Sequence, residues 1–495
     1  MITKPSLRRG LWSTAAVIVG AMIICLLGPS TTASGPGVES CPALPSPVYA
    51  ERSSADATTL ALDGSTATSS GAERPWQLGA LFSASAAPGR GLIGAHLLID
   101  PTGGRLYSSD ARQIGDAVRR GYRDAGVRFW VPESTACGVG VRRFVRAEDS
   151  RYATTSTAAQ SLAAAGWRDQ GIAFRAEPLS EFRWPATDGK GPLDLPPYLS
   201  TDSAGWSAFR DATDPAERRL LYQIAATPIA IWLGGAADIT SHVAQITAAA
   251  AARRQAPHFV LYAIPRRDCD GYAAGGLADP DTYRRWIDGI RAGIGGRPAV
   301  VVVEPDAIGM SCLSPAEATE RLALLRYALR TLSADPDTWV YLHAGSAGLD
   351  PAVIVPTLIS AGIEHARGFA VNVAGFDTTS NEVDYGKRLL RGLAAAGIAD
   401  KHFVVDTSRN GSGRPAAGST GDVPRWCNPR GRSLGERPTP HTGDDQVDAL
   451  LWIKPPGESD GPCYEGDPTG WFGSYAIGLA SRALARGTIA ELPLP

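Results

Sequence analysis

The chain lacks the features that mark several large functional classes. Its 48 Lys and Arg residues are balanced by 50 Asp and Glu residues, so no basic excess points to nucleic acid and no long acidic run points to a solvating tail. None of the seven cysteines forms a Cys-x-x-Cys pair, and we assign no metal site. No glycine-rich nucleotide loop is present, and we expect no cofactor.

Only one apolar run is long enough to span a membrane. It extends from Leu11 to Gly28, after Arg8-Arg9, and is followed by the small residues Thr31-Thr32-Ala33. This pattern predicts a signal peptide or an uncleaved N-terminal anchor over residues 1–33, so we expect a secreted or envelope-associated protein and leave membrane anchoring open. Six cysteines remain beyond the run, and an even number in an exported chain favours disulfides.

The next part of the chain contains an internal repeat. Residues 34–47 are rich in Gly, Ser and Pro and predict a linker. Within residues 48–182, Arg105–Ser109 leads to Gly121–Phe129, and 45 residues later Ser150–Thr155 leads to Gly166–Phe174. An earlier, degenerate copy ends at Phe82, so we predict a β-rich module of three copies, with helices at Ala111–Arg120 and Ala158–Ala165.

The second copy resembles a Tyr-Thr-Thr-Ser, Gly-Trp, Gly-x-x-Phe repeat that is appended to exported bacterial hydrolases. That resemblance leaves two roles open, carbohydrate binding and a spacer that adds stability. Cys41 and Cys137 could join the ends of the module. Residues 183–217, rich in Pro, Asp, Gly and Ser, predict a second linker.

From residue 218 to 495, short apolar runs alternate with helical stretches. Pro315–Leu332 and Val383–Ala395 have helical periodicity. This alternation predicts an α/β fold with a distorted parallel barrel of seven or so strands. The expected strands are Pro228–Trp232, Phe259–Ile264, Ala299–Val303, Trp339–Leu342, Phe369–Val373, Phe403–Val405 and Ala449–Ile453.

Polar and aromatic residues follow each of these strands. The clearest case is Glu304-Pro305-Asp306, two acids at the exit of a buried valine run, where a carboxylate is costly unless it has a partner or a task. The carboxyl ends of parallel strands meet at one rim, so we expect an active site there. The other residues at these ends are Trp232, Arg267, Asp268, His343, Asn372, Asp406, Arg409, Lys454, Glu458 and Asp460.

Several carboxylates together with tryptophans suit glycoside hydrolysis. That reaction needs one protonated acid and one assisting carboxylate, and aromatic rings hold the sugars. A Ser-His-Asp hydrolase is the main competitor. We expect no nucleophile elbow, and His343 has no evident nucleophile partner.

Five motifs occur in order along the predicted barrel: Tyr262-Ala-Ile-Pro-Arg-Arg267-Asp268-Cys269, Val303-Glu304-Pro305-Asp306, Asp406-Thr407-Ser408-Arg409-Asn410-Gly411, Trp426-Cys427-Asn428-Pro429, and Leu451-Trp452-Ile453-Lys454-Pro455-Pro456-Gly457-Glu458-Ser459-Asp460-Gly461. Together they resemble glycoside hydrolase family 6, a family of inverting cellulases, over roughly residues 220–490. The resemblance implies a β-glucan substrate and no cofactor.

The resemblance also implies roles for individual residues. Asp306 would be the general acid, Asp268 would raise the pKa of Asp306 as a nearby like charge, and Asp460 is the candidate base. Tyr262 would favour distortion of the sugar at the cleavage subsite. The residues that would contact substrate or orient the carboxylates are Trp232, Trp426, Lys454, Glu458, Arg267 and Arg409, and we add Asn372 to the substrate-binding set. The resemblance also implies the disulfides Cys269–Cys312 and Cys427–Cys463.

The chain departs from the family after the fourth strand. Where the family reads Asp-Ala-Gly-His and then Trp, this chain has His343-Ala344-Gly345-Ser346 and Leu349, so a carboxylate, an imidazole and an aromatic platform are absent together. Ala274 also replaces a loop serine. Both departures concern the binding of the leaving-group sugars.

Our interpretation is a secreted, monomeric endo-β-1,4-glucanase that acts with inversion. Endo cleavage is expected because the segments 460–463 and 410–426 are too short to roof the site. Two alternatives stay open. One is a carbohydrate-binding or envelope protein on a weakened barrel, and the other is a glycosidase for another surface polysaccharide.

Overall fold

The computed structural model describes residues 41–494, apart from 53–57, 63–75, 148, 180–181, 186–190, 270 and 310–311. The predicted leader over residues 1–33 and most of the first predicted linker lie outside the described residues. Within the described ranges, none of the helices has the length and apolar character needed to cross a bilayer.

The N-terminal module is built from three units of three antiparallel strands. In each unit the first strand pairs with both others: β1 (Ser46–Arg52) with β2 (Thr58–Leu62) and β3 (Trp76–Ala84), β4 (Leu92–Ile99) with β5 (Arg105–Ser108) and β6 (Arg123–Pro132), and β7 (Val139–Arg146) with β8 (Asp149–Ala153) and β9 (Arg168–Pro178). Helices α1 (Ala111–Arg119) and α2 (Ser156–Ala164) connect the last two strands of the second and third units. The β-rich character predicted from the sequence is confirmed, but the prediction missed the first strand of these two units.

Equivalent aromatic residues of the three units meet in the core of the module. Phe82, Phe129 and Phe174 contact one another edge to face, with ring centroids 5.3–5.7 Å apart. The Tyr107 hydroxyl binds the Leu60 backbone at 3.0 Å, and the Tyr152 hydroxyl accepts the Tyr107 backbone N–H at 2.9 Å. The repeat in the sequence therefore reflects a repeated packing role, one Phe for each unit.

From residue 191 onward, the segment predicted as a second linker is folded. It contains a 3-10 turn at Pro192–Asp194, helix α3 (Ala204–Asp211) and the start of α4 (Pro215–Ala225). Leu193 and Phe209 are buried in apolar clusters with residues of the barrel. Its polar composition misled the prediction because only a few apolar residues are needed to anchor short helices.

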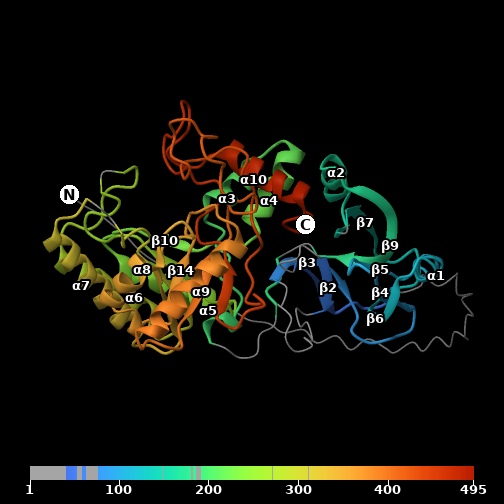
Figure 1. Ribbon diagram of the computed structural model, residues 1–495, viewed down its shortest axis with the longest axis horizontal. Helices are drawn as coiled ribbons and strands as arrows, with labels where there is room; N and C mark the ends of the chain where they lie inside the picture. The colour runs from blue at the N-terminus through green and yellow to red at the C-terminus, as the bar shows by residue number, and fades with distance from the viewer. Residues whose placement is uncertain are drawn as a thin grey trace, which may run out of the picture. The chain divides into compact units, whose positions relative to one another are not determined.

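The barrel contains seven parallel strands in sequential order, as predicted. They are β10 (Ile231–Leu233), β11 (His258–Leu261), β12 (Ala299–Val303), β13 (Thr338–His343), β14 (Gly368–Val371), β15 (His402–Asp406) and β16 (Val447–Leu451). The helices are α5 (Ile239–Ala252), α6 (Pro280–Ile294), α7 (Pro315–Leu332), α8 (Pro351–Ser360), a 3-10 turn at Ile363–His365, α9 (Thr379–Ala395) and α10 (Gly473–Arg486). Helices α5–α9 follow the strands in chain order (Figure 1).

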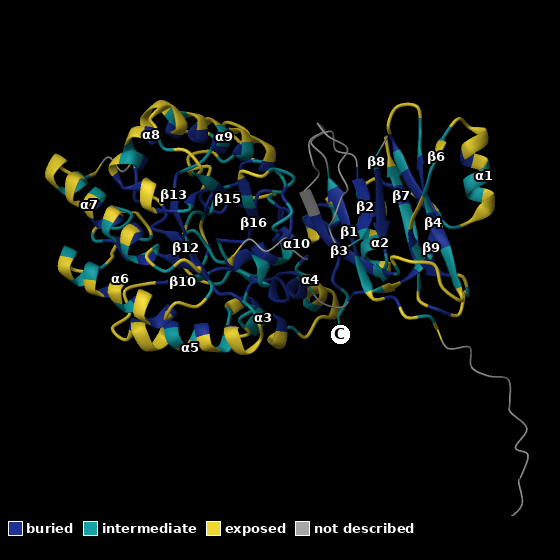
Figure 2. Cartoon of the chain, turned by 90° about the horizontal axis from the view of Figure 1, so that it is seen from below, coloured by how far each residue is buried: buried dark blue, intermediate teal, exposed yellow. Residues whose placement is uncertain are grey.

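Both faces of the sheet are buried. Val301 and Val303 of β12 pack in the cluster that the surrounding helices cover, whereas Val300 and Val302 pack in the cluster inside the curl of the sheet. Figure 2 shows these strands buried and the helices exposed only on their outer sides. A run of four valines is therefore the expected sequence for this strand.

Three strands, β11, β14 and β16, end earlier than predicted, and for β11 and β16 the reason lies in the acids of neighbouring strands. The backbone N–H groups of Ala263 and Ile264 donate to the carboxylate of Glu304, not to another strand. The N–H groups of Ile453 and Lys454 donate in the same way to Asp406. Each carboxylate thus ends the neighbouring strand and shapes the loop that follows.

Candidate active site

The backbone is unusual at the carboxyl ends of the strands. Eleven non-glycine residues among the described ones have positive φ, and eight of them lie in the loops of the predicted site. Such conformations are costly for residues with a Cβ, and they gather at functional sites. The eight are Arg266, Asp268, Cys269, Glu304, Asp306, Asn372, Ala374 and Asn428.

Asp306 follows β12 with φ of 64° and keeps 57% of its side-chain surface accessible. Its backbone N–H donates to Nδ1 of the buried His343 at 2.8 Å. Because Nδ1 accepts this bond, it carries no proton, and burial lowers the pKa of His343. The 3.8 Å between His343 Nδ1 and Asp306 Oδ1 is therefore not an ion pair at neutral pH.

The pKa of Asp306 is raised. Desolvation by the surrounding protein is the largest cause, Asp268 adds to the rise as a like charge, and His343 and Lys454 would oppose it as cations. Since His343 is neutral, its opposing effect is absent near pH 7. A carboxyl in this setting keeps its proton longer than an ordinary aspartate.

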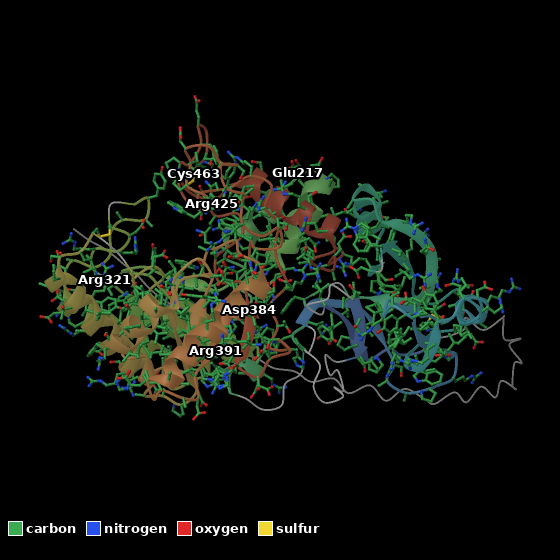
Figure 3. The ribbon with its side chains drawn as sticks, viewed as in Figure 1. Glu217, Arg321, Asp384, Arg391, Arg425 and Cys463 are labelled. Atoms are coloured by element: carbon green, nitrogen blue, oxygen red, sulfur yellow. A yellow bond between two sulfur atoms is a disulfide. The ribbon has the colours of Figure 1, made fainter. Side chains whose placement is uncertain are left out.

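Asp268 lies on the loop after β11, and this loop is held from two sides. Its carboxylate accepts the backbone N–H of Ala273 at 2.8 Å. Arg321 of α7 donates to the carbonyls of Pro265 and Arg266 at 2.9 and 2.8 Å, and it is labelled in Figure 3. The disulfide Cys269–Cys312, which we predicted, joins the same loop to the segment after β12.

Asp460 is bound more tightly than the other two aspartates. Its Oδ2 accepts from Arg409 Nη1 at 2.8 Å and from the Asn428 backbone N–H at 3.1 Å. Its own N–H donates to Asn428 Oδ1 at 2.8 Å, and its Oδ1 lies 3.9 Å from Lys454 Nζ. Oδ2 is therefore engaged by fixed partners, while Oδ1 is the oxygen left for a further ligand such as water.

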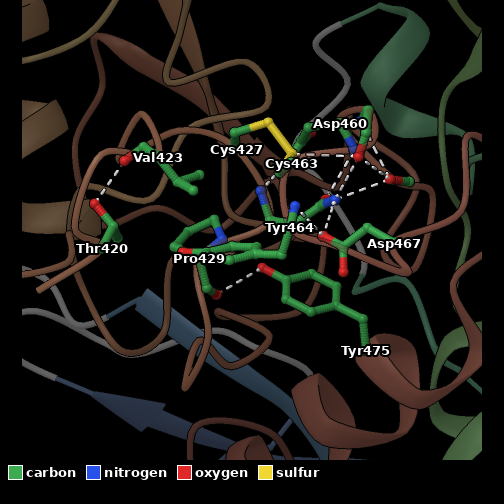
Figure 4. Close-up of a disulfide and its surroundings, with 12 residues drawn as sticks. Thr420, Val423, Cys427, Pro429, Asp460, Cys463, Tyr464, Asp467 and Tyr475 are labelled. Atoms are coloured by element: carbon green, nitrogen blue, oxygen red, sulfur yellow. Dashed lines mark hydrogen bonds between the residues drawn. A yellow bond between two sulfur atoms is a disulfide. The ribbon is translucent and has the colours of Figure 1, made fainter.

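The second predicted disulfide, Cys427–Cys463, joins the loop that carries Asp460 to the segment that carries Asn428. It lies beside Asn428 and Asp460, and Asn428 Nδ2 also donates to Ser459, Gly461 and Asp467. Figure 4 shows this network around the disulfide. The third disulfide, Cys41–Cys137, closes the N-terminal module.

Aromatic residues line the same region. Tyr262 meets Trp232 edge to face, with the ring centroids 5.2 Å apart. The guanidinium carbon of Arg267 lies 4.5 Å from the centroid of the Tyr262 ring. Trp426 is 53% exposed and contacts Tyr272, which is 57% exposed, at 6.3 Å. Tyr272 was missed by the sequence analysis because no pattern distinguishes it from other loop residues.

Three residues of the predicted substrate-binding set are engaged by protein groups. Arg409 is fully buried and binds Asp460. Arg267 donates to the Ala273 and Tyr262 carbonyls, and among the described residues it has no carboxylate partner. Asn372 is buried, and its Nδ2 donates to the Asp406 carbonyl at 2.8 Å. In this structure their contacts hold loops in place, and Arg409 and Asn372 are closed off from solvent.

Lys454 and Glu458 form a pair of charged groups beside Asp460. Burial lowers the pKa of Lys454, with Asp460 opposing, and burial raises the pKa of Glu458, with Lys454 opposing. Lys454 Nζ also lies 5.9 Å from the Trp232 ring. The two side chains therefore lie close enough to Asp460 and to each other to influence one another's ionisation.

One expectation about motifs was wrong. Gly457-Glu458-Ser459-Asp460-Gly461 has the letters of a Gly-x-Ser-x-Gly elbow. The stretch lies in the loop between β16 and α10, and Ser459 Oγ bonds to Gly461 O and Asn428 Nδ2. It is not a strand–turn–helix elbow, so the conclusion against a serine hydrolase is unchanged. Over the described ranges, no cluster of three His, Cys, Asp or Glu residues is arranged to bind a metal ion.

Sequence comparison matches two parts of the chain to known families. The family described as Glycosyl hydrolases family 6 matches residues 196–482. A domain of unknown function, DUF5648, matches residues 96–180.

Curated relatives include endoglucanases and, at 33–34% identity, probable 1,4-beta-D-glucan cellobiohydrolases of Aspergillus species. Endoglucanase A of Cellulomonas fimi is 39% identical over 293 residues, which are 58% of this chain and 61% of that protein, so the match spans less than two thirds of that relative. Endoglucanase 1 of Streptomyces halstedii is 40% identical over 299 residues, covering 59% of this chain and 88% of that protein.

Solved structures agree in fold. An endoglucanase of Mycobacterium tuberculosis, in complex with methyl-cellobiosyl-4-deoxy-4-thio-beta-D-cellobioside, has a TM-score of 0.55 at 42% identity and covers 59% of this chain and 99% of that chain. The catalytic core domain of a cellobiohydrolase of Chaetomium thermophilum has a TM-score of 0.51 at 26% identity, covering 59% and 98%.

Proposed function

Because the chain belongs to glycosyl hydrolase family 6, we propose that it is a secreted endo-β-1,4-glucanase that inverts the anomeric carbon. The single observation that supports this best is the setting of Asp306. An accessible carboxyl with a raised pKa lies at the end of β12, and a second aspartate, Asp268, contributes to that rise. This is the setting that a general acid needs.

In the proposed reaction, Asp306 gives its proton to the glycosidic oxygen as the bond from that oxygen to the anomeric carbon breaks. A water attacks the anomeric carbon from the opposite face and loses a proton to a carboxylate. Asp460 Oδ1 is our candidate acceptor, because Oδ2 is bound by Arg409 and Asn428. Asp268 would act by raising the pKa of Asp306 and by relaying a proton through water.

The sugars would be held by the exposed aromatic residue and the charged pair beside the site. Trp426 offers an open face for stacking, and Lys454 and Glu458 offer hydrogen bonds. Arg409, Arg267 and Asn372 would position the catalytic loops. Three disulfides fit export to an oxidising compartment. We propose that the enzyme acts as a monomer, and that any anchoring would involve residues 1–33.

For the N-terminal module, the structure favours a supporting role over sugar binding. The tryptophan of the Gly-Trp repeat, Trp167, is buried, and the guanidinium groups of Arg146 and Arg151 lie 4.6 and 5.2 Å from its ring. The large hydrophobic residues that the described part of the module exposes are Val118, Val127 and Ile172, all aliphatic. Aliphatic side chains offer no stacking platform for a sugar ring.

The test is the viscosity of a soluble cellulose derivative measured against the reducing ends released. An endo-enzyme should reduce the viscosity steeply for each bond cut, because cuts in the middle of a polymer shorten it most. Release of cellobiose with little loss of viscosity would contradict endo cleavage. No release from any glucan would favour the binding-protein alternative, or a glycosidase for another polysaccharide.

A further inference from the structure

The loop after β13 is where this chain departs from its family, and Arg414 reaches into that loop from the segment after β15. Arg414 Nη2 donates to Ser346 Oγ at 2.9 Å. Its guanidinium also lies against Gly348, where a Cβ would be only 2.6 Å from Nη1. The Arg414 side chain nevertheless keeps 38% of its surface accessible. The guanidinium is therefore partly exposed, and it lies beside Ser346, three residues after His343.

Arg414 is held in one orientation. Its Nε lies 3.1 Å from Asp377 Oδ2. The other oxygen of Asp377 accepts the Thr378 backbone N–H at 2.9 Å and Asn381 Nδ2 at 2.8 Å, so this carboxylate is itself fixed. A guanidinium that is already oriented loses little conformational freedom when it binds a ligand.

Apart from Asp377, the surroundings of Arg414 carry little negative charge. The family's aspartate after the fourth strand is replaced by His343, which is neutral. Glu382 of α9 accepts the Ala347 backbone N–H at 3.0 Å, and burial raises its pKa to about 8, so it is uncharged at pH 7. The charged groups that act on Glu382 are Asp377, Arg414 and Arg388. The charged groups near Glu382 are therefore two arginines and one aspartate.

We propose that Arg414 determines specificity for the leaving-group sugar, and that it favours glucans with an anionic substituent at that position. The proposal rests on the β-1,4-glucanase function proposed above. A guanidinium binds a carboxylate through two parallel N–H···O bonds. Leu349, exposed where the family has an aromatic residue, cannot stack on a sugar face. Binding on this side therefore relies on hydrogen bonds and charge.

The experiment compares kcat/KM on carboxymethyl cellulose with kcat/KM on hydroxyethyl cellulose, a neutral derivative. We expect Arg414→Met to lower the ratio of the two kcat/KM values about fivefold to tenfold, the usual worth of one hydrogen bond at a site open to solvent. Arg414→Lys keeps the charge but cannot make two parallel bonds to a carboxylate, so it should restore only part of the ratio. Arg391→Met, an exposed arginine of α9 labelled in Figure 3, removes the same charge elsewhere and should leave both rates unchanged.

An unchanged ratio in Arg414→Met, with both rates lowered equally, would overturn the proposal and leave Arg414 a packing role. An equal fall of the ratio in Arg391→Met would also overturn it, because the effect would then belong to the overall charge. Affinity electrophoresis of Asp306→Asn, with and without Arg414→Met, in gels containing either polymer measures the same ratio without turnover. Wild-type inactivity on both polymers would refute the glucanase function, while the electrophoresis would still test Arg414.

Discussion

The titration of Glu304 should be visible in the stability of the barrel. Its side chain is fully buried, and burial raises its pKa from 4.5 to about 7. The unfolded chain loses this proton near pH 4.5, whereas the folded chain keeps it until about pH 7. Below pH 4.5 the carboxyl is protonated in both states, so its burial costs no ionisation energy. As the pH rises from about 4.5 to about 7, only the unfolded chain releases this proton, and the free energy of unfolding falls by about 3 kcal/mol.

Glu304→Gln should remove this dependence with little loss of structure. Glu304 Oε2 accepts both the Ala263 and the Ile264 N–H, at 3.0 and 3.1 Å, and an amide oxygen at the same place can accept both. The amide does not ionise. At pH 8 we expect the variant to be more stable than wild type by up to about 3 kcal/mol, which corresponds to about 5 °C in Tm for a domain of this size. At pH 4.5 we expect the two proteins to be nearly equal in stability.

The assay is calorimetric unfolding of both proteins between pH 4.5 and 8.5, with the disulfides intact. Glu320→Gln, on the exposed side of α7, controls for the loss of one carboxyl. The reasoning would be refuted by a difference in Tm between wild type and Glu304→Gln that is the same at pH 4.5 and pH 8. Such a constant difference would mean that Glu304 has the same pKa in the folded and the unfolded chain.

Three further predictions concern the reaction. Asp306→Asn should abolish cleavage of unactivated glucans but retain more rate on a substrate with a good leaving group, and full activity on cello-oligosaccharides would exclude it as the acid. Asp268→Asn removes a like charge and should therefore lower the pKa of Asp306. The alkaline limb of the pH profile of kcat/KM should then move to lower pH, and an unmoved limb would contradict the coupling between the two aspartates. Proton NMR of fresh product should show the α-anomer first, and an initial β-anomer would rule out inversion.

Much of the barrel follows from the order of residues along the chain. Strands and helices alternate with distinct periodicities, and α7 begins and ends at the predicted residues, Pro315 and Leu332. That helix has local signals, a Ser314 cap with Glu317 in a capping box and Pro315 at its first turn. The two disulfides of the barrel were implied by motifs and not by spacing.

Sequence could not show which polar residues would be buried. Arg409 was expected to orient a carboxylate and to contact substrate, and only the structure shows it fully buried against Asp460, 51 residues away. The predicted linker at 183–217 failed for the same reason. Burial depends on which distant groups a segment meets, and composition does not record that.

The amino-acid sequence alone determined the class of fold, the repeat of the N-terminal module and the identity of the acids at the strand ends, because these depend on local periodicity and on motifs. The tertiary structure decided how each acid behaves. The bond from the Asp306 N–H to His343 and the contact of Arg414 with Ser346 join residues 37 and 68 positions apart. Such contacts form only when parallel strands bring their carboxyl ends to one rim, and a pKa or a specificity set there depends on distances in space.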